Sequence, residues 1–260
     1  MDNIGALALV GSGEYLPVMQ DLESALINSG ISNGKPNRFL QIPTAAGEES
    51  RERLQFWESR GAEQARRIGT VQDFLPIYNR EDAFNQEYIS RVKDAALIYF
   101  SGGDPGYLAN SLRDTPLWAE IEKNWLAGAS LAGCSAGAMA MSSDVPNFFR
   151  MKSEGIPGFN IIPHIRPIPH YNKFFGWIPD SAAKIVMKAP DGTLIIGIDE
   201  DTALVTGLDP RTSLSKNNWQ VYGDGSVHIL SGAPTARFES GELVSLQISN
   251  MTINLVVDFL

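Results

Sequence analysis

The stretch that decides the fold is LAGCSAGAMA, residues 131–140, in which small residues surround one cysteine and one serine. Its centre, GCSAG (133–137), fits the pattern G-x-S-x-G, in which a sharp strand-to-helix turn lifts a serine above the carboxyl ends of a sheet. The nucleophile of such a turn has a strained backbone, and glycines two residues before and after it remove side-chain collisions. A tight packing turn without chemistry is the alternative interpretation of the same five residues.

The positions of the two glycines bear on which atom attacks, the hydroxyl or the thiol. With Ser135 in the centre, both flanking positions are glycine, whereas with Cys134 in the centre both are alanine. The strained turn therefore favours Ser135, and we expect Cys134 to point into the sheet as a small apolar filler. Thiol catalysis by Cys134 stays open as an alternative.

Around this stretch, short apolar runs alternate with amphipathic ones, which is typical of a parallel sheet covered on both faces. Strands are predicted over residues 4–10, 71–77, 96–100 and 130–132, with one more from Arg38 that runs into a loop. A polar-faced helix is predicted from Glu48 to Gly61. We therefore expect an α/β fold with a mostly parallel central sheet.

The pattern changes after about Thr193, where closely spaced strands are joined by glycine-rich turns. These strands predict an antiparallel extension of the same sheet, or a small sheet packed against it. No linker or internal repeat interrupts the chain. Residues 1–260 are therefore expected to form one domain.

Composition excludes several classes of partner. The 260 residues carry a net charge of −9, and an acidic surface argues against nucleic acid and anionic membranes, because phosphate groups need a basic patch. The first apolar run is too short to span a bilayer and lacks the basic start of a signal peptide. We therefore expect a cytoplasmic protein without nucleic-acid or membrane partners, and leave homodimer formation open. A single cysteine excludes an internal disulfide.

The segment Gly11-Ser12-Gly13 follows the first predicted strand and resembles the start of a dinucleotide-binding fingerprint. The third glycine of that fingerprint is missing, because position 16 is Leu. We favour a plain turn here. No cluster of histidines and cysteines predicts a metal site, and no cofactor is expected.

A serine nucleophile needs a base, and the chain has three histidines. His228 lies in an alternating strand, which favours a surface or cross-strand position. His164 and His170 both lie in a proline-rich loop after the elbow, and loops at strand ends commonly carry function. Either of the two could therefore serve as the base.

An orienting acid and an oxyanion hole complete such a site. The segment GIDEDTALV (197–205) ends a buried strand in three carboxylates, and FSGGDPG (100–106) follows another strand with unobstructed backbone N–H groups. Gly103 and Ala136 are the candidate oxyanion donors. If the strand through the carboxylates stays extended, Asp199 and Asp201 face one side and Glu200 the other.

Taken in order, four segments resemble the family of cyanophycinase and aspartyl dipeptidase (dipeptidase E). They are IYFSGGDPGYLANSL (98–112), LAGCSAGA (131–138), IPHY (168–171) and GIDEDTALV (197–205). The resemblance implies a serine peptidase on the glutamine-amidotransferase-like, flavodoxin-like α/β fold, without a cofactor. It also implies Ser135 as nucleophile, His170 as base and Glu200 as acid.

The family cleaves small or unusual peptides after an acidic residue, so the resemblance implies a small peptide substrate. An acidic side chain needs positive groups or N–H groups around it. The candidates for substrate binding are Gly102, Asp104, Arg166 and Lys173.

The chain departs from cyanophycinase in two places. Pro105 stands where that enzyme has glutamine, and Lys173 alone stands where several arginines follow the histidine. Small aspartyl peptides are therefore expected to be better substrates than cyanophycin. The alternatives are a cyanophycin-degrading exopeptidase, and a non-catalytic or amidotransferase-like module of the same fold.

Overall fold

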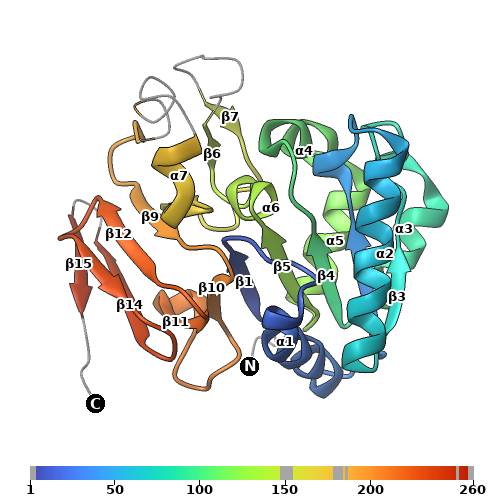
Figure 1. Cartoon of the computed structure of the whole chain (residues 1–260), viewed down its shortest axis with the longest axis horizontal. Helices are drawn as coiled ribbons and strands as arrows, with labels where there is room; N and C mark the ends of the chain where they lie inside the picture. Colours follow the sequence, from blue (N-terminus) through green and yellow to red (C-terminus); the bar gives the residue numbers. More distant parts are fainter. Residues whose placement is uncertain (1–3, 147–154, 178–183, 185–186, 250–251, 257–260) are drawn as a thin grey trace.

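The computed structural model describes residues 4–146, 155–177, 184, 187–249 and 252–256, and Figure 1 shows their arrangement. Its centre is a nine-stranded sheet in the order β15-β14-β11-β10-β1-β5-β4-β2-β3. The part from β1 to β3 is parallel, and the part from β10 to β15 is antiparallel. The predicted parallel sheet and its antiparallel extension are both confirmed.

The parallel strands are β1 (Leu7–Val10), β2 (Arg38–Ile42), β3 (Val71–Phe74), β4 (Leu97–Phe100) and β5 (Ser130–Cys134). The antiparallel strands are β10 (Thr202–Thr206), β11 (Asn218–Gly223), β14 (Leu243–Ser249) and β15 (Thr252–Val256).

The small additional sheet, which the sequence offered as an alternative to the extension, is also present. Its order is β13-β12-β9-β8, with β8 parallel to β9 and the other pairs antiparallel. Its strands are β8 (Ile165–Ile168), β9 (Leu194–Ile198), β12 (Val227–Ser231) and β13 (Ala236–Phe238). A short pair, β6 (Asp144–Val145) and β7 (Ile156–Pro157), lies beside α4.

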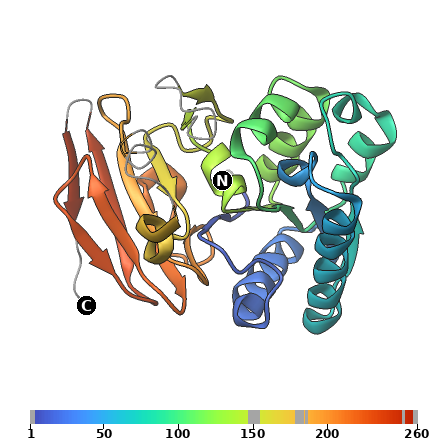
Figure 2. The same cartoon turned by 45° about the horizontal axis from the view of Figure 1, so that its top comes forward.

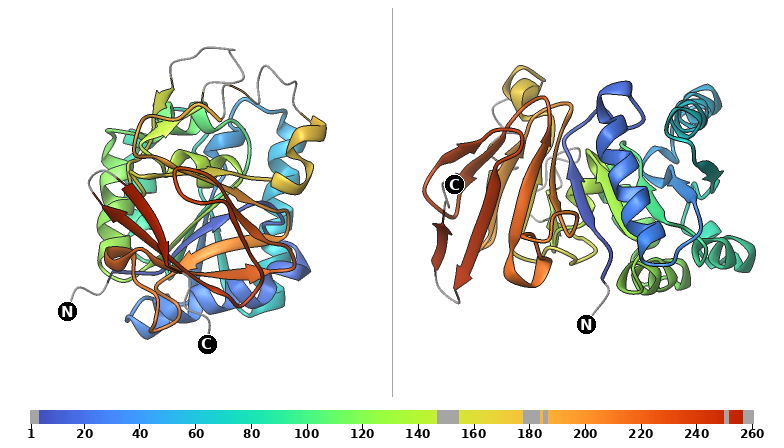
Figure 3. Two further views of the ribbon diagram at one scale, coloured as in Figure 1. Left: turned by 90° about the vertical axis from the view of Figure 1, so that its left-hand side faces the viewer. Right: turned by 90° about the horizontal axis from the view of Figure 1, so that it is seen from below.

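Helices cover both faces of the parallel strands (Figure 3). One face carries α1 (Gln20–Ser32) and α2 (Arg51–Ile68). The other carries α3 (Gln86–Val92), α4 (Pro105–Leu112), α5 (Pro116–Leu126) and α6 (Ala136–Ala140). A further helix, α7 (Tyr171–Trp177), follows β8, and 3-10 turns lie at 17–19, 44–46, 82–84 and 214–216.

Burial on both faces explains why the strands are continuous apolar runs. In β1, Leu7 and Leu9 belong to the core on the face covered by α3 to α6, whereas Ala8 and Val10 belong to the core on the face covered by α1 and α2. One prediction is wrong: α2 does not end at Gly61. A Cβ at Gly61 would lie 2.0 Å from Oε1 of Gln41, so this glycine provides close helix-to-sheet packing inside the helix.

The topology gathers several loops at one edge of the sheet. Because β1, β4 and β5 are parallel, the loops that follow them leave at the same edge. Strand β10 is antiparallel to β1, with Val10 opposite Ala203, so the turn before β10 reaches this edge too. Figure 2 brings the edge with α6 and α7 forward. Of the helices described, none has the length and apolar character needed to cross a membrane.

Candidate active site

Ser135 lies in the turn between β5 and α6, with φ of 49° and ψ of −106°. A positive φ is uncommon for a residue with a side chain and costs free energy, so the surrounding structure must impose it. A Cβ at Gly133 would lie 2.4 Å from the carbonyl carbon of Gly137, which shows how closely the turn folds back on itself. The strained position therefore belongs to Ser135, as the positions of the glycines predict.

Cys134 is fully buried on the α1 side of the sheet, which confirms that it points inward. Its surroundings are not simply apolar, however, because Sγ lies 2.8 Å from Oε2 of Glu14. Burial raises the pKa of the Cys134 thiol well above its usual range, and the nearby charge of Glu14 raises it further. The thiolate needed for thiol catalysis is therefore disfavoured.

Three side chains from separate segments meet beside the turn. Nε2 of His170 lies 3.1 Å from Oγ of Ser135, and Nδ1 of His170 lies 3.2 Å from Oε1 of Glu200. His170 comes directly after β8, and Glu200 after β9. Because these two strands pair in parallel, with Ile168 opposite Gly197, their following residues arrive side by side. The structure thus brings together the three residues that the resemblance implies.

The reason for expecting Glu200 to face away from its neighbours was wrong. Strand β9 ends at Ile198, and the three acids lie in the turn before β10, where Asp201 has φ of 54°. Asp199 is buried, and its two oxygens accept hydrogen bonds from Nε2 of His228 and the N–H of Ser226, each at 3.1 Å. Turn geometry, not strand alternation, separates Glu200 from the other two carboxylates.

Glu200 is held at several points. Its Oε2 lies 3.3 Å from Nζ of Lys173, and its backbone N–H donates to Oδ1 of Asn172 at 3.1 Å. Partial burial of the carboxyl raises its pKa, but hydrogen bonds and charge from His170 and Lys173 outweigh that effect, so the pKa of Glu200 lies below its ordinary value. The carboxylate is therefore ionised at neutral pH and can accept a hydrogen bond from the imidazole.

The loop after β4 leaves one backbone N–H available beside Ser135. The N–H groups of Ser101, Gly102 and Asp104 donate to Ile42 O, Glu14 Oε1 and Ala45 O. The N–H of Gly103 has no protein acceptor among the described residues, and Gly103 is exposed. A Cβ added to the preceding glycine would lie 3.5 Å from Cβ of Ser135, so the loop passes directly beside that serine.

A second donor is available across the turn. Ala136 is the first residue of α6, so its N–H has no intrahelical acceptor. This geometry keeps Gly103 and Ala136 as candidate oxyanion donors. Gly102 contributes no free N–H, because Glu14 accepts its hydrogen bond.

The remaining candidate substrate contacts have other partners. Oδ1 of Asp104 caps α4 by accepting from the N–H of Tyr107 at 2.9 Å. The side chain of Arg166 is only 2% exposed and pairs with Asp144, so its expected role as a substrate contact is wrong: its charge is buried. Lys173 is exposed but pairs with Glu200.

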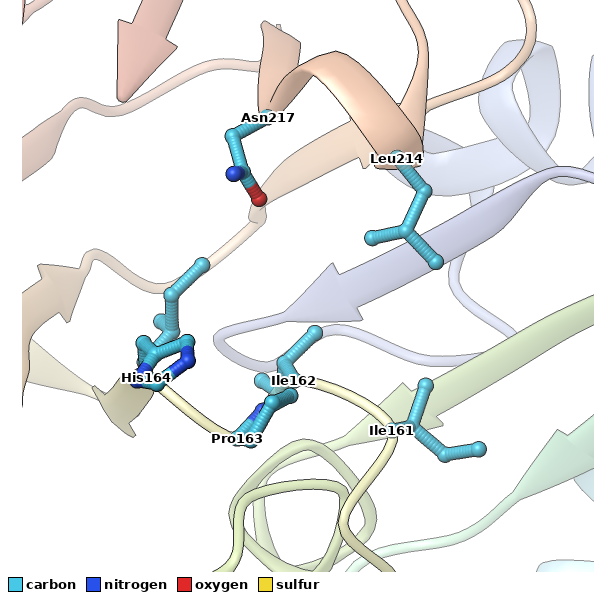
Figure 4. Close-up of a pocket in the computed structure, with 7 residues that line it drawn as sticks. Ile161, Ile162, Pro163, His164, Leu214 and Asn217 are labelled. Carbon is cyan, nitrogen blue, oxygen red and sulfur yellow. The ribbon is translucent and has the colours of Figure 1, made fainter. Parts of the chain in front are cut away.

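His164 lies at the opposite end of β8 from His170, and Figure 4 shows its surroundings. It lines a pocket of about 130 Å³ with Ile161, Ile162, Pro163, Ile165, Leu214 and Asn217. The four residues of β8 cover roughly 13 Å, so the two histidines cannot share one site. Within the described part of the chain, no group of three His, Cys, Asp or Glu side chains is arranged to hold a metal ion.

Sequence reasoning missed the residues that support the site from behind. Glu14, which directly follows the turn predicted at Gly11-Ser12-Gly13, received no role from the sequence, yet it is 6% exposed and contacts both Gly102 and Cys134. His228 takes the predicted cross-strand position, because its Nε2 lies 3.1 Å from Oδ1 of Asp199, directly after the paired strand β9. Its ring also lies 4.7 Å from that of Tyr171, the neighbour of His170, a contact that the sequence pattern did not indicate. The only local signals in the sequence for these supporting residues were the glycines of GSGE (11–14) and the tyrosine that follows His170.

The chain is similar to curated cyanophycinases. Cyanophycinase from Trichormus variabilis is 30% identical over 191 residues, which cover 68% of this chain and 56% of that protein. Cyanophycinase from Synechococcus elongatus is 28% identical over 170 residues, or 61% of this chain and 48% of that protein. The chain thus spans about half the length of the curated relatives it matches.

Two solved structures are similar in fold. A peptidase from an acI-B1 actinobacterium has a TM-score of 0.88 and 56% identity, covering 93% of this chain and 97% of that one. A putative peptidase E from Listeria monocytogenes has a TM-score of 0.55 and 22% identity, covering 78% and 94%, and shows likeness of fold alone. The model of peptidase family S51 matches residues 7–209, a span that contains the elbow, His170 and Glu200. The chain therefore belongs to peptidase family S51.

Proposed function

We propose that this chain is a serine peptidase that hydrolyses small peptides through an acyl-enzyme formed on Ser135. The observation that carries the proposal is the chain of contacts from Oγ of Ser135 to His170 and on to Glu200, at 3.1 and 3.2 Å. The strained backbone at Ser135 supports the same role, because nucleophile turns are among the places where such strain is found. Family membership agrees with the reaction class.

In the proposed reaction, Oγ of Ser135 attacks the peptide carbonyl carbon while Nε2 of His170 takes the hydroxyl proton. The N–H groups of Gly103 and Ala136 hold the oxyanion of the tetrahedral intermediate. His170 then gives its proton to the leaving amine as the C–N bond breaks. Water attacks the acyl-enzyme by the same route, which releases a carboxylate product and restores Ser135. Glu200 accepts a hydrogen bond from Nδ1 and stabilises the imidazolium.

For the substrate, we propose short peptides with an acidic residue before the cleaved bond, with aspartyl peptides preferred over cyanophycin. Pro105 is buried at the start of α4, so it offers no hydrogen bond where cyanophycinase has glutamine. Arg166 is buried and paired, which leaves Lys173 as the exposed cation nearest to the triad among the candidates. An assay of both substrates at equal enzyme tests this: rapid cyanophycin degradation without dipeptide cleavage would reverse the preference.

Labelling with a fluorophosphonate tests the nucleophile directly, because the reagent reacts with an activated serine. We expect wild-type protein to be labelled, with the label on the peptide that contains Ser135. Ser135→Ala should abolish labelling, whereas Cys134→Ala should keep it. Absence of labelling in folded wild-type protein, or a label that survives Ser135→Ala, contradicts the proposal.

A further inference from the structure

The loop GSGEY, residues 11–15, follows β1 and lies behind the candidate active site. It is the segment in which a dinucleotide fingerprint was incomplete, and the proposed reaction gives it no role. Its side chains nevertheless contact three of the four segments that form the site: the loop after β4 with Gly103, the end of β5 next to Ser135, and the turn before β10 with Glu200.

Glu14 joins the first two of these segments. Its Oε1 accepts a hydrogen bond from the N–H of Gly102 at 3.1 Å, and its Oε2 lies 2.8 Å from Sγ of Cys134. Gly102 precedes the candidate oxyanion donor Gly103, and Cys134 precedes the nucleophile. A single carboxyl group, 6% exposed, therefore links the residue before the oxyanion donor Gly103 to the residue before the nucleophile Ser135.

The neighbouring side chains fix the loop itself. The hydroxyl of Tyr15 is 3.0 Å from Oγ of Ser101, and its N–H donates to Oε1 of Glu23 at 3.0 Å. Tyr15 has φ of 64° and is 2% exposed, a strained backbone that packing imposes. On the other side, Oγ of Ser12 accepts a hydrogen bond from the N–H of Asp201 at 3.4 Å. Hydrogen bonds thus join the loop to Ser101 and Glu23 on one side and to Asp201 on the other.

We infer that Glu14, supported by Tyr15, is a positioning residue that sets the oxyanion hole relative to the nucleophile. The inference rests on the proposed function and deepens it. Two consecutive glycines make the loop after β4 easy to deform. By taking the N–H of Gly102, Glu14 fixes the orientation of that loop and leaves the N–H of Gly103 as the donor directed at substrate. Donors must lie within 2.7–3.1 Å of the oxyanion to act, so small displacements are costly.

Two substitutions of similar size separate the hydrogen bonds of Glu14 from its volume. Glu14→Gln keeps an oxygen acceptor for the N–H of Gly102, whereas Glu14→Met fills the space with only a weak acceptor. The readouts are the maximal rate of fluorophosphonate labelling, kinact, and the reversible constant, KI. We expect Glu14→Met to lower kinact by roughly 10- to 100-fold with KI unchanged, and Glu14→Gln to stay within about threefold of wild type.

Ser130→Ala is the matched control. It removes a buried hydroxyl bound to Leu26 O at the far end of β5, and should leave kinact at the wild-type value. Melting curves check that each variant folds. If Glu14→Met does not fold, Tyr15→Phe tests the positioning role instead, because it removes only the contact of the Tyr15 hydroxyl with Ser101. For Tyr15→Phe we expect roughly a 3- to 10-fold lower kinact than for wild type.

The outcomes separate the two proposals. Folded wild-type protein that takes no label refutes the proposed function. Wild-type protein that is labelled, together with Glu14→Met within about twofold of it, overturns the role of Glu14 alone. Equal losses in Glu14→Gln and Glu14→Met also overturn it, because the retained hydrogen bond would then have no effect. A wild-type rate in Tyr15→Phe is the corresponding contradiction where Glu14→Met is unfolded.

Discussion

Replacing Glu200 by glutamine tests the acid with almost no change in shape. Oε1 of Glu200 is 3.2 Å from Nδ1 of His170, which places the two charges of the ion pair about 4 Å apart once the imidazole is protonated. At an effective dielectric of 20, unit charges at that distance attract by about 4 kcal/mol. The carboxylate is 24% exposed, and the same effective dielectric suits such a partly solvated group. Losing this attraction corresponds to roughly a 10³-fold lower rate.

The amide adds a second effect. It can donate to Nδ1, which favours the tautomer whose Nε2 carries a proton and cannot accept one from Ser135. We therefore expect Glu200→Gln to lower kcat/KM on a small aspartyl peptide, and the fluorophosphonate labelling rate, by roughly 10³-fold. The assay measures both rates on folded protein at neutral pH.

Two controls accompany this variant. Asp201→Asn makes the same chemical change one residue later, and asparagine tolerates the positive φ there, so its rate should stay near wild type. Lys173→Ala removes only the partner of the other carboxylate oxygen and should cost less than about tenfold. A Glu200→Gln variant that keeps more than about a tenth of the wild-type rate refutes the role of Glu200 as the acid. An Asp201→Asn variant whose rate falls as much as that of Glu200→Gln refutes it as well.

Three further outcomes are expected. His170→Ala should lower labelling as much as loss of the nucleophile, because such residues act as a unit, whereas His164→Ala should stay near wild type; the reverse order would exchange the two roles. Burial raises the pKa of Glu23 to about 8 from an ordinary 4.5, so the folded state binds the extra proton between these values and stability falls as pH rises through them, by up to about 1.4 kcal/mol per pH unit. Glu23→Gln should therefore flatten the dependence of Tm on pH between 5 and 8, and an unchanged slope would contradict this. A Cβ at Gly197 would lie 2.4 Å from the ring of Tyr171, so Gly197→Ala should lower the labelling rate of the folded protein, with a melting curve to check folding. An unchanged labelling rate would show that this ring does not support His170.

Local patterns in the sequence predicted much of the fold. Both faces of β1, β2, β4 and β5 are buried, so each strand appears as an apolar run that can be located without knowing its neighbours. The elbow is also local, since the collisions that require glycine at 133 arise within five residues. Gly61 shows the limit of such patterns: it looks like the end of a helix, but the atom that demands glycine belongs to Gln41, twenty positions earlier.

The sequence by itself determined which serine occupies the strained turn, and the resemblance of four segments supplied the histidine and the acid. Only the tertiary structure decided how these groups are supported. Arg166 is buried because Asp144 pairs with it, and Asp199 binds His228 across two strands of the small sheet. Glu14 reaches Cys134 only because β1 and β5 pair in register. Contacts of this kind join residues 22 to 120 positions apart, and they depend on strand register and turn geometry, which no local spacing of residues encodes.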